Sequence, residues 1–269
     1  MTYLAIDSIK NRTFDAIVVG TGISGGWAAK ELTGKGLRTL VLERGRDVKH
    51  ITDYPTTMMQ PWELEHRGQV PLAVRNEYTI ASKNYAFRED TVHFFTKDAE
   101  QPYVQEQPYD WIKAYQVGGR SLLWGRMTQR WSDFDFGGPA RDGYAVDWPI
   151  RYADIAPWYS YVEKFIGVSG NRDGLAQLPD GEFLPPHEMS CVEKHFRQKI
   201  GEKYPDRPMI IGRVAHLTQP KPIHLQQGRA QCQHRNLCDR GCPYGGYYSS
   251  NSTTIQWAER TGKMTLRPH

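Results

Sequence analysis

Two short apolar runs near the start of the chain are separated by a segment of mixed polarity. The first run, residues 14–20 (FDAIVVG), ends in glycine, and the second, residues 37–42 (LRTLVL), is followed by an acid. Short apolar runs with such boundaries are typical of buried parallel strands, and the residues between them are enough for one crossover helix. The pattern therefore predicts a strand–helix–strand unit, the beginning of an α/β fold.

The remaining pattern is less regular until the end of the chain. Residues 46–105 hold several prolines and many aromatic residues with no period of 2 or 3.6, which predicts a long irregular excursion. We expect its large aromatic residues to lie in a core: Trp62, Tyr78, Tyr85, Phe94 and Phe95. Residues 249–268 are expected to form a capped helix followed by a strand, which would return the chain to the first unit.

Three glycines follow the first apolar run in the spacing GxGxxG, at the expected turn into the helix. Gly20 would permit a tight turn, Gly22 would let the main chain approach a pyrophosphate, and Gly25 would allow the helix to pack closely on the strand. Glu43, which closes the second run, stands where a ribose-binding carboxylate belongs. A lone GxGxxG also fits an ordinary glycine-rich turn, but the strand, helix, second strand and acid together predict a dinucleotide site.

The composition is that of a globular enzyme: 269 residues, of which 39% are hydrophobic and 24% charged, with a formal net charge of +4. That charge is small and scattered, so nucleic acid is not an expected partner. No apolar stretch reaches the length of a membrane span. Residues 1–13 are too short and too polar for a signal peptide, so we expect the chain to carry no export signal of its own.

Three of the four cysteines, Cys232, Cys238 and Cys242, lie in one polar loop, CQHRNLCDRGC. Thiols clustered in a loop rich in Gly, Arg and Asn indicate soft-metal ligation or redox chemistry, and four cysteines do not make a disulfide framework in a chain of this size. Three thiolates suit an iron–sulfur cluster that lacks one iron corner, whereas His234 could complete a zinc site of three cysteines and one histidine. Cys191 is expected to be a lone core or helix cysteine.

A second glycine-containing segment is YQVGGRSLLWGRMTQRW, residues 115–131. Gly118 and Gly119 precede Ser121, and Gly125 follows a few residues later. Glycines spaced this closely let the main chain contact a flat or charged cofactor. The same stretch also fits an ordinary loop that leads into a helix.

These motifs together resemble the glucose-methanol-choline oxidoreductases. The resemblance rests on GTGISGG, VGGRSLLWG and DWPIRYADIAPWYSYVEKFIGVSG, spans most of the chain, and is closest to the flavoprotein subunits of bacterial sugar dehydrogenases. It implies FAD in place of NAD in the Rossmann site, with the second glycine segment lying along the flavin and its diphosphate. The cofactor contacts that the resemblance implies are Gly20, Gly22, Ser24, Gly25, Glu43, Arg44, Gly118, Gly119, Ser121, Trp124 and Gly125.

The resemblance also implies the fold class: α/β, with a Rossmann-like FAD-binding domain and a second α+β substrate domain built on an antiparallel sheet, the latter incomplete in this chain. Residues 1–146 would be the first part of the FAD-binding domain, and residues 147–228 would begin the substrate domain. Residues 229–248 would form the iron–sulfur loop, and residues 249–269 would return to the FAD-binding domain.

The family implies a dehydrogenase that transfers hydride from a sugar or glycoside hydroxyl to flavin. Members that carry a 3Fe-4S cluster hold it with three cysteines at the spacing of Cys232, Cys238 and Cys242, and the cluster would relay electrons onward. The family's catalytic histidine pair is expected beyond residue 269, so no catalytic residue is assigned within the chain. We interpret three other histidines as surface or structural residues: His93, His216 and His224.

Two other functions stay open from the sequence. A flavin oxidase of the same superfamily would use the cysteines as a structural zinc site, and it would make peroxide in an iron-free preparation. A non-catalytic Rossmann binding module would keep the nucleotide fold but leaves the cysteine loop without a role.

Partners and location follow from the resemblance. In the resembling complexes a small subunit with a twin-arginine signal escorts the folded flavoprotein across the membrane, and a c-type cytochrome subunit accepts the electrons. The expectation is therefore a periplasmic, heteromeric enzyme that is membrane-associated only through its partners. A soluble cytoplasmic enzyme is the alternative, because the chain itself carries no export signal.

Overall fold

The computed structural model describes residues 13–269. The chain divides into two compact units. The first unit takes the chain up to Trp124 together with His234–Gly245 and Ser249–His269, and the second takes Gly125–Gln233 and Gly246–Tyr248. The cysteine loop is therefore shared, because Cys232 belongs to the second unit while Cys238 and Cys242 belong to the first.

The first unit is built on a three-stranded parallel sheet in the order β1–β2–β3. Strand β1 (Ala16–Val19) pairs with β2 (Thr39–Leu42), and β2 pairs with β3 (Met264–Arg267), so that the last strand joins the first two from the far end of the sequence. Helix α2 (Ile23–Gly34) connects β1 to β2. The predicted strand–helix–strand unit is confirmed, and the parallel sheet is compatible with a Rossmann-like fold.

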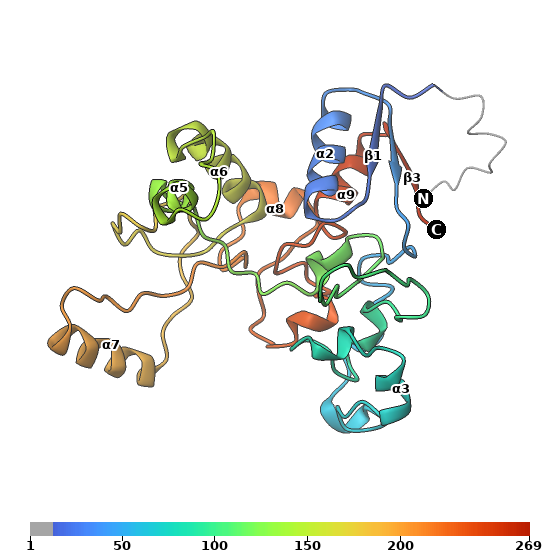
Figure 1. The fold of residues 1–269 in the computed structure, drawn as a ribbon, viewed down its shortest axis with the longest axis horizontal. Helices are drawn as coiled ribbons and strands as arrows, with labels where there is room; N and C mark the ends of the chain where they lie inside the picture. The colour runs from blue at the N-terminus through green and yellow to red at the C-terminus, as the bar shows by residue number, and fades with distance from the viewer. Residues whose placement is uncertain (1–12) are drawn as a thin grey trace. The chain divides into compact units, whose positions relative to one another are not determined.

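Helix α9 (Thr254–Arg260) precedes β3 and packs against α2, and the two helices lie beside the sheet (Figure 1). Their close approach depends on Gly26, where a Cβ atom would lie 2.5 Å from the hydroxyl of Thr254. The apolar side chains between helices and sheet form one buried cluster: Val18, Ala29, Val41, Val117, Ile255, Ala258 and Leu266. The helix and strand expected near the end of the chain are thus present, and they complete this core.

The excursion of residues 46–105 folds on a second core of its own within the first unit. Its regular elements are short: η1 (Pro61–Glu63), α3 (Leu72–Asn76), η2 (Ala81–Lys83) and η3 (Val92–Phe94). The expectation of buried aromatics holds for Tyr78, Phe94 and Phe95, which lie in this core with Tyr54 and Phe87. It is wrong for two others, since 75% of Trp62 and 69% of Tyr85 is exposed.

The second unit is mainly helical in the described chain. It holds α4 (Asp133–Phe136), α5 (Gly138–Asp142), α6 (Tyr152–Ile166), α7 (Cys191–Lys203) and α8 (Pro222–Gln226). Its interior is fixed by a buried ion pair in which Arg130 donates to Glu163 at 2.6 Å. The antiparallel sheet expected from the resemblance is not formed by the described residues of this unit, whose strand pairing is limited to isolated bridges such as Met127 with Val214.

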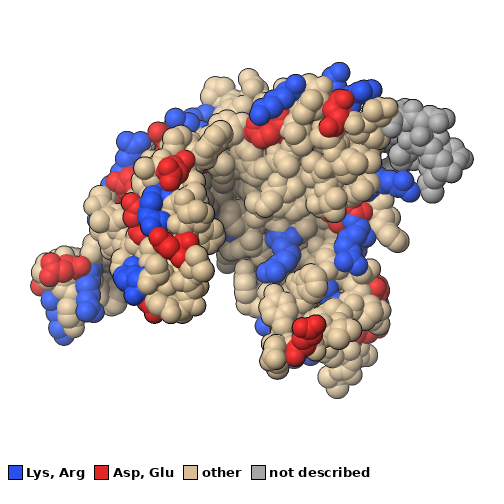
Figure 2. Space-filling model, turned by 45° about the horizontal axis from the view of Figure 1, so that its top comes forward, with Lys and Arg blue, Asp and Glu red and all other residues tan. Residues whose placement is uncertain are grey.

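Charged residues are distributed as the composition predicts. On the face drawn in Figure 2, Lys and Arg lie interspersed with Asp and Glu. None of the helices described in residues 13–269 has the length and apolar character needed to cross a membrane.

Candidate functional site

The first glycine turn has the geometry that a bound phosphate group requires. Gly20 adopts a φ of +89°, which favours glycine, and Gly22 caps the N-terminus of α2 with open space where a Cβ atom would stand. At Gly25 a Cβ atom would lie only 2.1 Å from the carbonyl oxygen of Gly20. The turn therefore closes tightly on itself, and the space beside Gly22 at the N-terminus of α2 is open, an arrangement that fits a pyrophosphate.

Glu43 lies at the carboxyl end of β2 and reaches back to this turn. Its Oε2 accepts hydrogen bonds from the main-chain N–H of Thr21 at 2.9 Å and from the Thr21 hydroxyl at 2.5 Å, and its Oε1 accepts from the N–H of Gly45 at 2.9 Å. A carboxylate has about four acceptor positions, so further capacity for a ribose hydroxyl remains. Glu43 thus shapes the turn as well as standing where the ribose is expected.

The second glycine segment lies directly against the first. Gly118 and Gly119 have φ values of +90° and +53°, and a Cβ atom at Gly119 would lie 3.4 Å from the Cα of Gly22. The N–H of Gly118 donates to the hydroxyl of Thr21 at 3.0 Å. The two segments, nearly a hundred residues apart in sequence, therefore form one backbone cradle.

The other residues predicted to contact the cofactor have different surroundings. Ser121 holds the cradle internally, because its hydroxyl donates to the carbonyl of Gly118 and accepts from the N–H of Ser250 at 2.9 Å. Arg44 lies over the ring of Tyr115 at 4.3 Å and donates to Gln101. The remaining three are Ser24, exposed in the first turn of α2, Trp124, half-buried at the end of the first unit's long segment, and Gly125, which opens the second unit.

Two residues that sequence reasoning missed hold the cradle together. Thr21 is fully buried and links Glu43 to Gly118, although it stands at a variable position of GxGxxG. Asn251 is 3% exposed and lies against Gly118, where a Cβ atom would be 3.0 Å from that of Asn251. Its signal in the sequence is only its place in a polar run, SSNSTT, before an expected helix.

The part of the cysteine loop that belongs to the first unit is anchored on the excursion. Arg240, in the short helix η5 (Cys238–Arg240), donates to Asp90 at 2.5 Å and to the carbonyl of Met59 at 2.7 Å. The hydroxyl of Thr57 donates to the carbonyl of Gly241 at 2.6 Å. Both members of the Arg240–Asp90 pair are buried. The irregular segment of residues 46–105 therefore holds residues 238–242 in place through these hydrogen bonds.

Gly241 brings the same loop onto an aromatic ring. It has a φ of +80°, and a Cβ atom there would lie 2.6 Å from the ring of Tyr54. A second pair, Arg88 with Asp239 at 3.3 Å, fastens the loop beside it. The main chain on both sides of Cys238 and Cys242 is consequently held by contacts within one unit.

The three cysteines that were predicted to be metal ligands, Cys232, Cys238 and Cys242, are half-buried. Cys232 is tied by its N–H to the carbonyl of Leu217 at 2.8 Å, and the carbonyl of Cys242 accepts from Gly245. Among the residues that the structure describes, no group of three or more His, Cys, Asp or Glu side chains is placed to hold a metal ion. Cys191 lies exposed at the start of α7, which agrees with the expected lone helix cysteine.

Histidines lie in three kinds of environment. His224 is fully buried, with one ring nitrogen 3.0 Å from the carbonyl of Lys164 and the other 3.0 Å from the N–H of Lys221, and burial lowers its pKa. His93 is partly buried against Phe94, and burial lowers its pKa to about 4. His216 lies 3.2 Å from His187 through ring nitrogens. His224 and His93 have structural surroundings.

His234, the candidate fourth zinc ligand, is exposed and has a φ of +52°. Left-handed backbone is uncommon for residues other than glycine and marks a constrained turn. Asn236, two residues on, has a similar φ of +56°, so the loop turns sharply between Cys232 and Cys238.

Comparison with known proteins finds relatives of modest identity over most of the chain. It is 25% identical over 85% of its length to paromamine 6'-oxidase of Streptomyces fradiae, and 26% identical over 96% to 6'''-hydroxyparomomycin C oxidase of Streptomyces lividus. It is 24% identical over 94% of its length to the fructose dehydrogenase large subunit of Gluconobacter japonicus. No family model matches the chain.

These homologues are oxidoreductases of the glucose-methanol-choline type, at modest identity over most of the chain, and the resemblance inferred from the glycine motifs is thereby confirmed. The chain spans only 35% of the first, 42% of the second and 44% of the third relative.

Proposed function

We propose that this chain is the FAD-binding portion of a dehydrogenase that oxidises a hydroxyl group of a sugar or glycoside. The substrate class follows the names of the relatives, which act on paromamine, hydroxyparomomycin and fructose. Bound FAD would supply the hydride acceptor. The residues of this chain would bind and orient the cofactor, and none of them is assigned as the catalytic base.

The observation that carries the proposal is the joint cradle of the two glycine segments. The N-terminus of α2 offers main-chain donors beside Gly22, and Gly119 lies against that position without a side chain. Anions are stabilised at such a helix terminus by its N–H groups and dipole. Thr21 fixes both segments to Glu43, so the donors would be held in place before a cofactor arrives.

The finer part of the proposal concerns the cysteine loop. We propose that Cys232, Cys238 and Cys242 ligate a 3Fe-4S cluster, as their spacing implies by resemblance to the iron–sulfur members of the family. The anchoring of residues 238–242 on the excursion supports a fixed site.

The remaining proposals concern the rest of the protein. The second unit would belong to an α+β substrate domain whose antiparallel sheet needs residues outside this chain. One relative is named as the large subunit of a dehydrogenase, which supports a subunit of a complex. We propose a small escort subunit with a twin-arginine signal, a c-type cytochrome acceptor and a periplasmic location, with a cytoplasmic enzyme as the alternative.

A second candidate is a flavin oxidase of the same type. Two of the relatives reported above are named oxidases, which is the observation that favours this candidate. In that case oxygen would take the electrons from reduced flavin, and the cysteine loop would be structural, with zinc as the metal to test.

Spectroscopy of the purified full-length protein distinguishes these functions. The dehydrogenase predicts a flavin absorbance band that bleaches anaerobically with a sugar, three irons per chain, and an electron paramagnetic resonance signal in the air-oxidised state. The oxidase predicts the same bleaching, peroxide on exposure to air, and no iron. Protein that is folded but retains no flavin after reconstitution with FAD would contradict both.

A further inference from the structure

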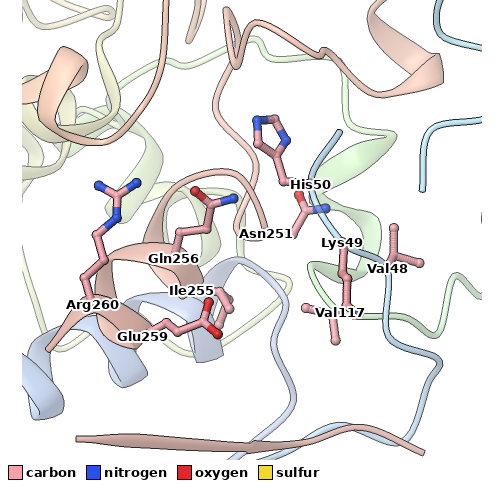
Figure 3. A pocket seen from close by; sticks show the side chains of 9 residues that line it. All are labelled: Val48, Lys49, His50, Val117, Asn251, Ile255, Gln256, Glu259 and Arg260. Atoms are coloured by element: carbon pink, nitrogen blue, oxygen red, sulfur yellow. The ribbon is translucent and has the colours of Figure 1, made fainter. Parts of the chain in front are cut away.

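A cavity of about 290 Å³ lies in the first unit, on the side of α9 that faces residues 48–50 (Figure 3). Three apolar side chains belong to its lining: Val48, Val117 and Ile255. All three are at most 3% exposed and therefore form a fixed floor. The lining also includes Asn251, so the cavity adjoins the cradle, although neither Gly20 nor Gly22 belongs to the lining.

One face of α9 supplies most of the polar rim. Gln256, Glu259 and Arg260 are spaced i, i+3 and i+4, which puts them on the same side of the helix. The side chains of Gln256 and Glu259 are half-buried, and they have no hydrogen-bond partner among residues 13–269. An amide and a carboxylate in this position supply hydrogen-bond donors and acceptors to the rim of the cavity.

The opposite side of the rim is made by His50 and Lys49. Nδ1 of His50 lies 3.1 Å from the hydroxyl of Tyr54, so the imidazole is oriented by a buried residue. Figure 3 shows the His50 ring and the Gln256 amide among the side chains that line the cavity. The rim thus offers several donors and acceptors in fixed directions around an apolar floor.

The charges of the lining nearly cancel. Lys49 and Arg260 are balanced in part by Glu259, and Lys49 lies 3.9 Å from Asp47. A free anion would meet the Glu259 carboxylate, and a free cation would meet Arg260. A neutral molecule that both donates and accepts hydrogen bonds avoids either repulsion, and each hydroxyl group does both.

We propose that this cavity binds a neutral polyhydroxylated molecule of about one sugar ring. The apolar floor would contact the C–H face of the ring, and Gln256, Glu259 and His50 would bond its hydroxyl groups. The volume is close to the ~300 Å³ lower limit of small-molecule sites, which suits a single ring. The site goes beyond the proposed oxidoreductase function, since none of the glycines that would contact the cofactor belongs to its lining.

The test is a titration of the full-length holoprotein with D-glucose, followed by nuclear magnetic resonance of the Ile255 methyl groups and the Gln256 side-chain amide. We expect saturable shifts of both signals with a dissociation constant on the order of 1 mM, typical of a few hydrogen bonds over a small apolar surface. The double variant Gln256→Ala and Glu259→Ala should weaken binding at least tenfold. Alanine is the best helix former, so both substitutions keep α9 helical.

The matched control is Gln198→Ala with Glu202→Ala on the exposed helix α7, where the same residue types bond each other at 2.9 Å. This variant should bind glucose like the parent. Equal affinity in the Gln256 and Glu259 variant, or the same shifts produced by inorganic phosphate, would overturn the proposal. Flavin absorbance in the same sample separates the two ideas, because bleaching without these shifts leaves the oxidoreductase function standing and removes only the cavity site.

Discussion

Nδ2 of Asn251 donates a hydrogen bond to the hydroxyl of Tyr54 at 2.9 Å, across 197 positions of sequence. Asn251 lies against Gly118 of the cofactor cradle, and the ring of Tyr54 lies under Gly241 of the cysteine loop. The two residues therefore join the two chemically important parts of the first unit through direct contacts. Both are buried, so the bond between them has no competing water.

Replacing Tyr54 with Phe tests this connection. The substitution keeps the ring beneath Gly241 and removes only the hydroxyl that accepts from Asn251, so a buried donor loses its partner at a cost of about 1–3 kcal/mol. We expect lower stability and several-fold weaker FAD retention, measured by denaturant unfolding and by flavin fluorescence. Tyr78→Phe, in the same aromatic core, is the control. Equal FAD affinity in both variants would show that the bond does not support the cradle.

A comparison of two glycines in α2 tests the turn itself. At Gly25 an added Cβ atom would lie 2.1 Å from the carbonyl oxygen of Gly20, whereas at Gly34 nothing lies within 4 Å. Gly25→Ala should displace the turn and lose FAD. Gly34→Ala should leave FAD binding intact and raise stability by roughly 0.5–1 kcal/mol, because alanine restricts the unfolded chain. Absorbance of the purified proteins gives the flavin content, and stoichiometric FAD in folded Gly25→Ala would exclude the proposed phosphate site.

Local patterns predicted the parts of the fold that local chemistry decides. The strands, the helix between them and the glycine turn follow from apolar runs and from residues that permit special backbone angles. The sequence also singled out Gly118 and Gly119, whose positive φ angles favour glycine. The seat of the cysteine loop was not predictable, because its bonds, such as Arg240 with Asp90, join residues 150 positions apart inside a segment without periodicity.

Thr21 illustrates another limit. The spacing GxGxxG treats its position as variable, yet its hydroxyl connects Glu43 to Gly118. Only the three-dimensional approach of the second glycine segment gives that hydroxyl its role. Similarly, the antiparallel sheet expected by resemblance is not formed by the second unit's described residues, since a sheet needs strand partners that a family motif does not supply.

The pair of Arg240 and Asp90 should control the order of the cysteine loop. Asp90→Asn leaves a buried guanidinium without its carboxylate, and breaking a buried pair in this way costs about 3–5 kcal/mol. We expect faster alkylation of Cys238 and Cys242, measured by mass spectrometry after short treatment with iodoacetamide. Asp142→Asn, which removes an exposed partner of Arg141, should alkylate at the parent rate. Unchanged alkylation in the Asp90 variant would mean that the loop is held by other contacts.

His93 should make the stability of the protein depend on pH in the acid range. Its pKa is about 4 in the folded protein, against 6.5 for an unperturbed histidine, chiefly because burial disfavours the charged ring, and the nearby charge of Arg46 adds to this. Above pH 6.5 this histidine is neutral in both the folded and the unfolded chain, so its lowered pKa does not change the free energy of unfolding there. As the pH falls from 6.5 to about 4, the unfolded chain takes up the proton first, so the free energy of unfolding falls, by roughly 3 kcal/mol in total.

The variant His93→Gln removes this titration and should flatten that part of the profile, measured by urea unfolding at several pH values between about 4 and 7. His195→Gln, at an exposed position of α7, is the control and should keep the slope of the parent. A His93→Gln profile as steep as that of the parent would assign the acid sensitivity to other groups. In that case His224 is the next histidine to substitute, because burial lowers its pKa as well. Both of its ring nitrogens bond main-chain groups, which protonation of the ring would disturb.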